Sequence, residues 1–181
     1  MPAMTTTTYE LDPVHTHLSF SVRHMMVSHQ RGQFTGVTGT MALDRANLAA
    51  SHVEVSIDVA TINTNNADRD NHLRSGDFFD VANHPKMTFV SKKVEAGDGD
   101  ELVVTGDLTI RGNTHSVVLK AEPISEESKD PFGNVRVGTS VTGKISRKEF
   151  GLVWNAILET GGVALADDVK LTLDVQFVRK S

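Results

Sequence analysis

The chain has 181 residues, which is enough for one domain to bury a full core without disulfides or a structural metal. Its hydrophobic content of 39% and charged content of 23% are those of a globular protein and exclude a disordered or fibrous chain. The net charge of -5, with no basic cluster, argues against a nucleic-acid binder, and the absence of cysteine excludes disulfides and thiolate metal sites.

Apolar and polar residues alternate through most of the chain, which is the pattern of strands that bury one face. A short first segment at 9–11 is separated by Pro13 from the next run and is expected to be an edge piece. Gly36 and Gly39 indicate a bulge or a close backbone approach in the run that follows. The longer predicted strands centre on residues 18–22, 37–43, 53–59, 87–94, 102–110, 117–119, 135–145 and 169–177.

One segment between these runs predicts a helix of about two to three turns. Asn66 can act as the N-cap, and Asp68 and Asp70 fall in the first turn, where the helix dipole favours negative charge. Arg74 falls in the last turn and is expected to form an exposed pair with Asp70. Gly76 is expected to provide a left-handed exit from the helix.

A second short turn is expected directly after this helix. Asp77 can cap it, and Pro85 prevents it from continuing into the next strand. Phe78 and Phe79 in this turn are interpreted as core residues that hold the helix down rather than as ligand contacts. The whole segment, at about 66–81, is therefore predicted to be a short helical plug.

The pattern as a whole predicts an all-β protein, an eight-stranded extended antiparallel barrel with this plug at its mouth. The barrel is expected to form a single domain at 9–181, after a flexible tail at 1–8. Closure removes the exposed edges of a long sheet. Because the inward positions are mostly aliphatic and only 6% of residues are aromatic, the interior is expected to leave a tunnel.

Polar residues in phase with the interior are the candidates for a mouth site. His24 is in register with Phe20 and Val22, so it either contacts a ligand head group or bonds to a loop carbonyl at the strand end. Arg69, His72 and Leu73 share one helix face and could aim a cation and an imidazole at an anionic or carbonyl group.

These candidates have structural alternatives. Arg69 could instead pair with Asp77 or Asp80. The run RKEFGLVW, which contains Arg147, Phe150 and Trp154, indicates either a pocket wall or a tight corner packed on the end of the barrel.

Metal binding and catalysis find little support. His15 and His17 are out of phase with His24, and no carboxylate completes a ligand set, so no metal site is expected. There is no Gly-x-Ser-x-Gly elbow, phosphate-binding glycine loop or zinc-protease helix. The protein is therefore not expected to be an enzyme.

Five stretches carry a resemblance to a known family. They are LDPVHTHLSFSVRH, GQFTGVTGTM, RDNHLRSGDFFDVANHPKMTFVS, GDLTIRGNTHSVVL and SRKEFGLVW. The chain resembles the YceI-like family of bacterial lipid-binding proteins from residue 9 to residue 177. The resemblance implies a lipocalin-like barrel with an apolar tunnel that binds a long amphiphile, such as a polyisoprenoid quinone or a polyprenyl phosphate.

The resemblance also implies an amphiphilic lipid as partner, a homodimer in some members, and no required cofactor beyond the bound lipid. Neither nucleic-acid binding nor stable membrane insertion is expected. Many similar proteins carry a secretory signal; since this sequence shows none, we expect a cytoplasmic protein, unless a signal has been removed from a periplasmic or secreted one. The expected ligand-binding residues are Phe20, Val22, His24, Met41, Ile57, Arg69, His72, Leu73, Phe89, Leu108, Val141, Arg147, Phe150, Trp154 and Leu173.

Three functions follow from these observations. The first is binding of a long amphiphile for transport, storage or sequestration. The second is a barrel enzyme that acts on an isoprenoid-type lipid, with mouth histidines as acid or base. The third is a filled barrel that serves as a protein-interaction module.

Overall fold

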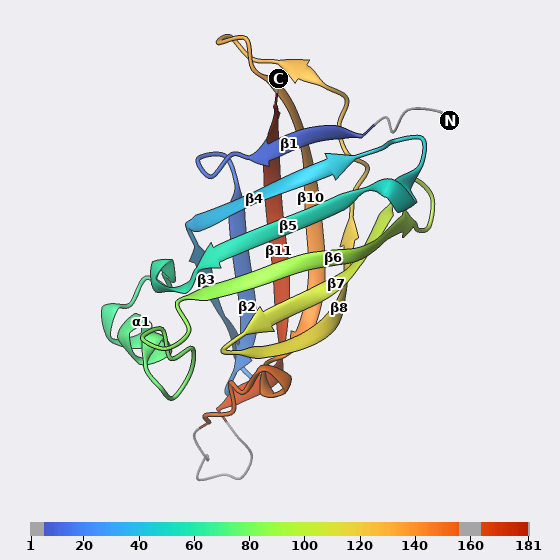
Figure 1. Cartoon of the computed structure of the whole chain (residues 1–181). Coiled ribbons are helices and arrows are strands. Elements are labelled where there is room, and N and C mark those ends of the chain that lie inside the picture. Colours follow the sequence, from blue (N-terminus) through green and yellow to red (C-terminus); the bar gives the residue numbers. More distant parts are fainter. Residues whose placement is uncertain (1–5, 156–163, 181) are drawn as a thin grey trace.

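A computed structural model of the chain describes residues 6–155 and 164–180. Eight strands close into an antiparallel barrel, as predicted (Figure 1). The membership of the ring differs from the prediction: the short segment at 9–11 belongs to a ring strand, and the run at 18–22 lies outside the ring. The strand β11 closes the ring, because one of its edges pairs with β10 and the other pairs with β1. Around the ring the strands are β1 (Thr7–Leu11), β4 (Gly36–Leu43), β5 (His52–Asp58), β6 (Lys86–Ala96), β7 (Leu102–Ile110), β8 (Asn113–Ala121), β10 (Val135–Ser146) and β11 (Leu165–Arg179).

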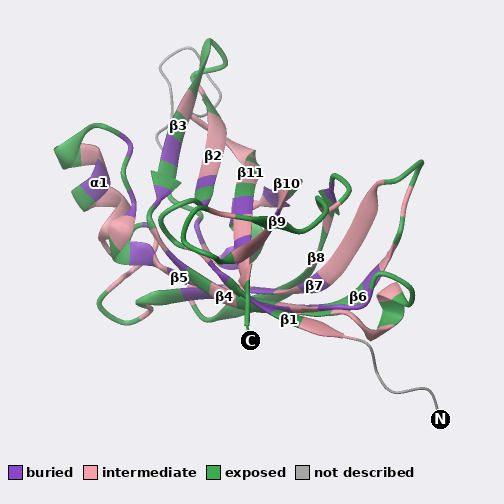
Figure 2. Ribbon diagram, turned by 90° about the horizontal axis from the view of Figure 1, so that it is seen from above, coloured by how far each residue is buried: buried purple, intermediate pink, exposed green. Residues whose placement is uncertain are grey.

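Two further strands, β2 (His17–His24) and β3 (Ser28–Phe34), form a hairpin beside the ring. The strand β2 pairs with β11 from Leu165 to Asp174, and β1 takes the same edge from Phe177 onward. Figure 2 shows this hairpin rising beside β11. The strand β3 was not predicted, because its inward positions are Gln30, Gly32 and Phe34 rather than a row of aliphatic residues.

The remaining elements are short. They are the 3-10 helices η1 (Leu48–Ala50), η2 (Val59–Thr61) and η3 (Arg147–Phe150), the helix α1 (Ala67–Arg74), and β9 (Ser128–Lys129), which pairs with β10. In residues 6–155 and 164–180, every helix is too short to cross a lipid bilayer. The barrel begins at Thr7, two residues before the predicted domain boundary.

The helix α1 begins as predicted and ends differently. Asn66 is the N-cap, and its side-chain oxygen accepts a hydrogen bond from the backbone N–H of Arg69 at 2.9 Å. The prediction of a left-handed exit at Gly76 is wrong, because the chain leaves through Ser75 in an extended conformation. The Ser75 hydroxyl and backbone N–H both donate to the carbonyl of His72, which satisfies the end of the helix without a glycine.

Two other predictions about this segment are wrong. Asp77 does not cap the following turn; the turn is closed by N–H groups that donate to the carbonyl of Ser75. The expected pair of Asp70 with Arg74 does not form either. Asp70 is buried and accepts bonds from the hydroxyl and N–H of Thr64, while Arg74 donates to the carbonyls of η2 and the residue after it. The helix is therefore tied back to residues 60–64 by polar contacts.

The backbone is tight at two glycines, and at Gly39 the predicted close approach is confirmed. Arg111 and Gly112, with φ of 51° and 73°, form the two-residue turn between β7 and β8. At Gly39 a Cβ would lie 2.5 Å from the carbonyl oxygen of Glu54 on β5, so only glycine lets β4 and β5 approach this closely.

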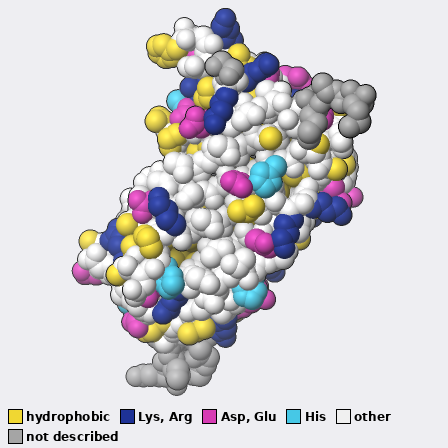
Figure 3. Space-filling view, viewed as in Figure 1, with side chains coloured by type: hydrophobic (Ala, Val, Ile, Leu, Met, Phe, Trp, Pro, Cys, Tyr) yellow, Lys and Arg dark blue, Asp and Glu magenta, His cyan; other side chains and the backbone are white. Residues whose placement is uncertain are grey.

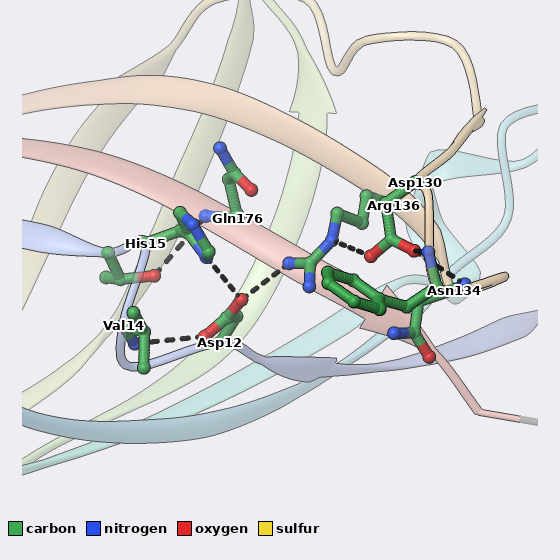
Figure 4. A network of polar contacts seen from close by, with 9 residues as sticks. Asp12, Val14, His15, Asp130, Asn134, Arg136 and Gln176 are labelled. Atoms are coloured by element: carbon green, nitrogen blue, oxygen red, sulfur yellow. Dashed lines mark hydrogen bonds and ion pairs between the residues drawn. The ribbon is translucent and has the colours of Figure 1, made fainter.

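A charged network holds the end of the barrel that carries both β1 and β9 (Figure 4). Arg136 of β10 contacts Asp12 at 2.5 Å and Asp130 at 2.7 Å. The His15 ring lies 2.8 Å from the same carboxylate of Asp12. The network therefore joins the corner after β1 to the turn between β9 and β10.

The network lowers the pKa of both carboxyl groups. Desolvation raises the pKa of Asp12, but hydrogen bonds from His15, Arg136 and the N–H of Val14 outweigh it, and the pKa falls from 3.8 to about 2. The hydrogen bond from Arg136 is the main cause for Asp130, whose pKa also falls to about 2. Both groups therefore stabilise the fold at neutral pH, and this contribution is lost as the pH falls toward 2.

We predict that Arg136→Met destabilises the protein at neutral pH and makes its stability less dependent on pH in acid. Without the guanidinium, the pKa values of Asp12 and Asp130 return toward their ordinary value, so less stability is left to lose below about pH 4. Urea unfolding between about pH 2.5 and pH 7 measures this. Lys144→Met, which removes an exposed 3.5 Å pair with Asp168, is the control and should change little. If the free energy of unfolding fell equally with pH in the wild type and in Arg136→Met, Arg136 would not be the cause of the lowered pKa values.

Candidate functional site

The barrel interior holds two adjoining cavities. The mouth chamber, of about 350 Å³, lies between α1, the β2–β3 hairpin and the residues that follow η3. The distal chamber, of about 150 Å³, lies farther along the barrel between β4, β5, β7 and β10. The residues that line both chambers are Leu18, Ile57, Leu108, Leu171 and Leu173.

The chambers are apolar because the inward positions of the strands carry aliphatic side chains. In the distal chamber these include Val55, Val104 and Leu119, with few polar groups among them. Aliphatic side chains of this size do not meet across the barrel, so space remains between the walls. Such a cavity favours an apolar occupant, since each CH₂ group taken out of water contributes about 0.8 kcal/mol.

Aromatic rings close part of the mouth. The His72 ring on α1 packs edge-on against Trp154 at 4.6 Å and against Phe78 at 5.1 Å, measured between ring centroids. Phe79 packs edge-on against Phe34 of β3 at 5.9 Å. The segment from α1 through the turn after it therefore contacts both the hairpin and the segment after η3 across the opening.

Arg69 places a positive charge in the wall of the mouth chamber. Its guanidinium donates to the hydroxyl and carbonyl of Thr64, at 2.8 and 2.6 Å, and to the side-chain oxygen of Gln30 at 2.8 Å. The predicted alternative, a pair with Asp77 or Asp80, is not what the structure shows. The Thr64 hydroxyl in turn donates to Asp70, so a neutral hydroxyl lies between the guanidinium of Arg69 and the carboxylate of Asp70.

Arg147 also lines the mouth chamber, but its contacts are structural. The side chain is buried, and it donates to the carbonyls of Leu152 (2.5 Å), Trp154 (2.8 Å), Leu165 (3.4 Å) and Ala166 (2.9 Å). Burial lowers the pKa of this guanidinium, and the charge of Asp167 partly opposes the shift. Arg147 therefore fastens the segment after η3 to the start of β11.

The two candidate histidines differ in their contacts. His72 lies 2.9 Å from the carboxylate of Asp77, which fixes its ring between Trp154 and Phe78. His24 faces the mouth chamber, as its strand phase predicted. Among the residues that the structure describes, none hydrogen-bonds its imidazole side chain, so the predicted bond to a loop carbonyl is not seen there.

All but one of the predicted ligand-binding residues lie in the chamber walls. Phe150 is the exception: it is completely buried, packs edge-on against His115 at 5.2 Å, and lines neither chamber, so a direct ligand contact is not expected there. Ligand contact by the others stays a prediction. The residues that line a chamber are Phe20, Val22, His24, Met41, Ile57, Arg69, His72, Leu73, Phe89, Leu108, Val141, Arg147, Trp154 and Leu173.

Several wall residues were missed by the sequence analysis. Gln30 was missed because β3 lacks an aliphatic pattern, and Thr64 because it lies in an irregular segment. Phe78 and Phe79 were interpreted as core residues only, yet both line the mouth chamber. The adjacent pair of aromatics directly after a predicted plug helix is a signal that could have identified them as wall residues.

Metal ligands do not gather here. Within residues 6–155 and 164–180, no group of three or more His, Asp or Glu side chains could hold a metal ion. Individual histidines contact single carboxylates instead, as His52 contacts Glu54 at 3.1 Å.

A closed eight-stranded antiparallel barrel with an apolar interior and polar side chains at one mouth defines a lipocalin-like fold. The comparisons with known proteins agree. A model of the YceI-like domain matches residues 9–177, and the chain belongs to this family.

Three similar proteins illustrate the match. The UPF0312 protein SERP2314 of Staphylococcus epidermidis is 38% identical, over 94% of this chain and 97% of that protein. The crystal structure of the Campylobacter jejuni YceI protein has a TM-score of 0.73 and 33% identity, covering 88% of this chain and 90% of that one. A polyisoprenoid binding domain from Saccharophagus degradans has a TM-score of 0.68 at 14% identity, covering 96% and 99%, and shows the shared fold.

We predict that Arg147→Met destabilises the protein by about 2–4 kcal/mol, because buried carbonyls lose their donors. Arg45→Met is the matched control. Arg45 also donates only to carbonyls, those of Ile124 and Ser125, but it is exposed, so its loss should cost less than about 1 kcal/mol. Chemical denaturation of both variants measures the difference. Equal losses would show that Arg147 does not hold the mouth together.

Proposed function

We propose that the protein binds one long-chain amphiphile, of the polyisoprenoid quinone or polyprenyl phosphate class, and holds its tail in the barrel for transport, storage or sequestration. The observation that carries this proposal is the pair of adjoining apolar chambers, which together run from the mouth along the barrel. A slender apolar tail fits this shape better than a compact ligand does.

Because the walls are apolar, the affinity for an amphiphile is expected to increase with the length of its tail. At about 0.8 kcal/mol for each buried CH₂, a few isoprene units outweigh any single hydrogen bond. The head group would then set orientation more than affinity.

The charge at the mouth favours a head group with oxygen acceptors. Among the residues that the structure describes, only neutral acceptors hold Arg69, and its guanidinium has five N–H groups, of which three are used by Thr64 and Gln30. A phosphate or carbonyl oxygen at the mouth would accept from such a group. This supports an amphiphile that enters tail first.

The comparisons support the general part of the proposal, which is that the barrel binds a lipid. The family is that of YceI-like domains, and the Saccharophagus degradans protein of the same fold is described as polyisoprenoid binding. The two chambers argue against the filled barrel as an interaction module. No contact among the described residues favours the enzyme alternative, since His72 is held by Asp77 and the rings around it.

The direct test is native mass spectrometry of protein purified without detergent, followed by organic extraction and identification of any bound lipid. A co-purified long-chain amphiphile in a one-to-one complex supports the proposal. Protein that is empty, and that also fails to take up long-chain prenols added in solution, would refute it.

We predict that Leu171→Trp weakens the binding of a long-chain prenol by about tenfold or more and leaves the binding of farnesol nearly unchanged. Leu171 lines both chambers, so an indole there blocks the passage between them, and excluding two CH₂ groups already costs about 1.6 kcal/mol. Thr172→Trp places the same ring at the next position of β11, outside both chambers, and is the matched control. An equal loss of affinity for both prenols would show that the long chain does not extend from the mouth chamber into the distal chamber.

A further inference from the structure

The turn between β2 and β3 exposes three adjacent apolar side chains. Met25, Met26 and Val27 are 46%, 66% and 80% exposed. Figure 2 shows the exposed end of this hairpin projecting away from the ring of strands. None of the three lines either chamber, so the ligand cavity does not explain them.

The backbone of this turn does not favour methionine either. Met25 and Met26 have φ of 52° and 56°, in the left-handed region, and the N–H of Val27 donates to the carbonyl of His24 at 3.1 Å. Two positive φ values at the centre of a hairpin turn strongly favour asparagine and glycine. Methionine at both positions is strained, so neither burial nor local conformation accounts for the sequence.

The turn stands beside the mouth of the cavity. The N–H of Met25 donates to the carbonyl of Ala164 at 2.6 Å, and Ala164 lines the mouth chamber. The next residue, Leu165, is held by the side chain of Asn155 at 2.7 and 2.9 Å. Two more exposed apolar side chains, Val153 (61%) and Trp154 (36%), directly precede Asn155.

The charge of the hairpin differs from that of the whole protein. No aspartate or glutamate occurs from Pro13 to Leu43, although the net charge of the chain is -5. Arg23 and Arg31 flank the turn on β2 and β3, and Arg23 donates to the carbonyl of Met26 at 3.3 Å. On the face seen in Figure 3, by contrast, lysine, arginine and acidic side chains are interspersed.

We propose that the β2–β3 turn docks on the surface of an anionic lipid bilayer, with Met25, Met26 and Val27 in the acyl boundary and Arg23 and Arg31 toward the lipid phosphates. Apolar side chains beside basic ones are the pattern of interfacial membrane contacts. Three side chains give weak, reversible attachment rather than insertion across the membrane. The docking turns the mouth chamber toward the bilayer. Exchange of a lipid between the bilayer and this chamber rests on the proposed function.

Co-flotation with vesicles tests the docking. The probe is vesicles of phosphatidylcholine with phosphatidylglycerol, and the variant is Met25→Asn/Met26→Gly/Val27→Ser. We expect the variant to lose at least about fivefold in the fraction bound. We also expect a higher Tm, since asparagine and glycine relieve the strain of the turn, so misfolding cannot account for the loss.

The matched control is Val118→Ser/Phe132→Ser. These side chains are 55% and 89% exposed and line neither chamber. Phe132 lies in the turn between β9 and β10, beside the Val178 end of β11, whereas His24 pairs with Leu165 at the other end. The control should float like the wild type, and vesicles without phosphatidylglycerol should bind the wild type less.

Three results would overturn the docking: no flotation of the wild type, equal flotation of the turn variant, or a dimer in solution that the turn variant abolishes while vesicles bind neither protein. The last result would assign the turn to a second copy of the chain. Binding of prenol added in solution is measured separately on both proteins and should be equal. If neither protein binds prenol, the proposed function fails, while flotation still decides whether the turn docks on membranes.

Discussion

The shared edge of β11 is the constraint on which the rest of the structure depends. Its end from Phe177 onward pairs with β1 and closes the ring, and its longer part from Leu165 to Asp174 pairs with β2. Because β1 and β2 share one edge of β11, the β2–β3 hairpin lies outside the ring. The hairpin extends the barrel wall past the mouth on one side. The mouth chamber occupies the space between this raised wall and α1, so the size of the cavity follows from where β1 stops and β2 begins.

Strand phase predicted most of the cavity wall from the sequence. Val22, Ile57 and Leu108 were placed correctly because inward positions repeat every second residue. The cap of α1 at Asn66 was also predictable, since it depends on residues within three positions. Two predictions failed because the residues involved do not carry the usual signal. The strand β3 lacks aliphatic residues on its inner face, and the exit of α1 uses a serine where a glycine was expected.

The contacts of the charged residues were beyond sequence reasoning. Arg69 and Arg147 were both placed at the mouth correctly, but their partners were not predicted. Arg147 donates to carbonyls as far as 19 positions away, and Arg69 reaches Gln30 on a strand that was itself missed. Backbone carbonyls are present at every residue, so no residue type marks the acceptor. Only the fold shows that Arg69 is hydrogen-bonded to Thr64 and Gln30 in the chamber wall, whereas Arg147 joins two segments of the backbone through their carbonyls.

The way α1 is attached has a consequence for how quickly the cavity exchanges its contents. Its only buried residue is Asp70, and hydrogen bonds fasten the helix to Thr64, Ala60 and Ile62. Water can replace each of these bonds, so breaking them exposes little apolar surface and costs far less than parting two strands of the barrel. An opening of the mouth at α1 would therefore be limited by the ring contacts of His72 and Phe79 rather than by the polar contacts of the helix.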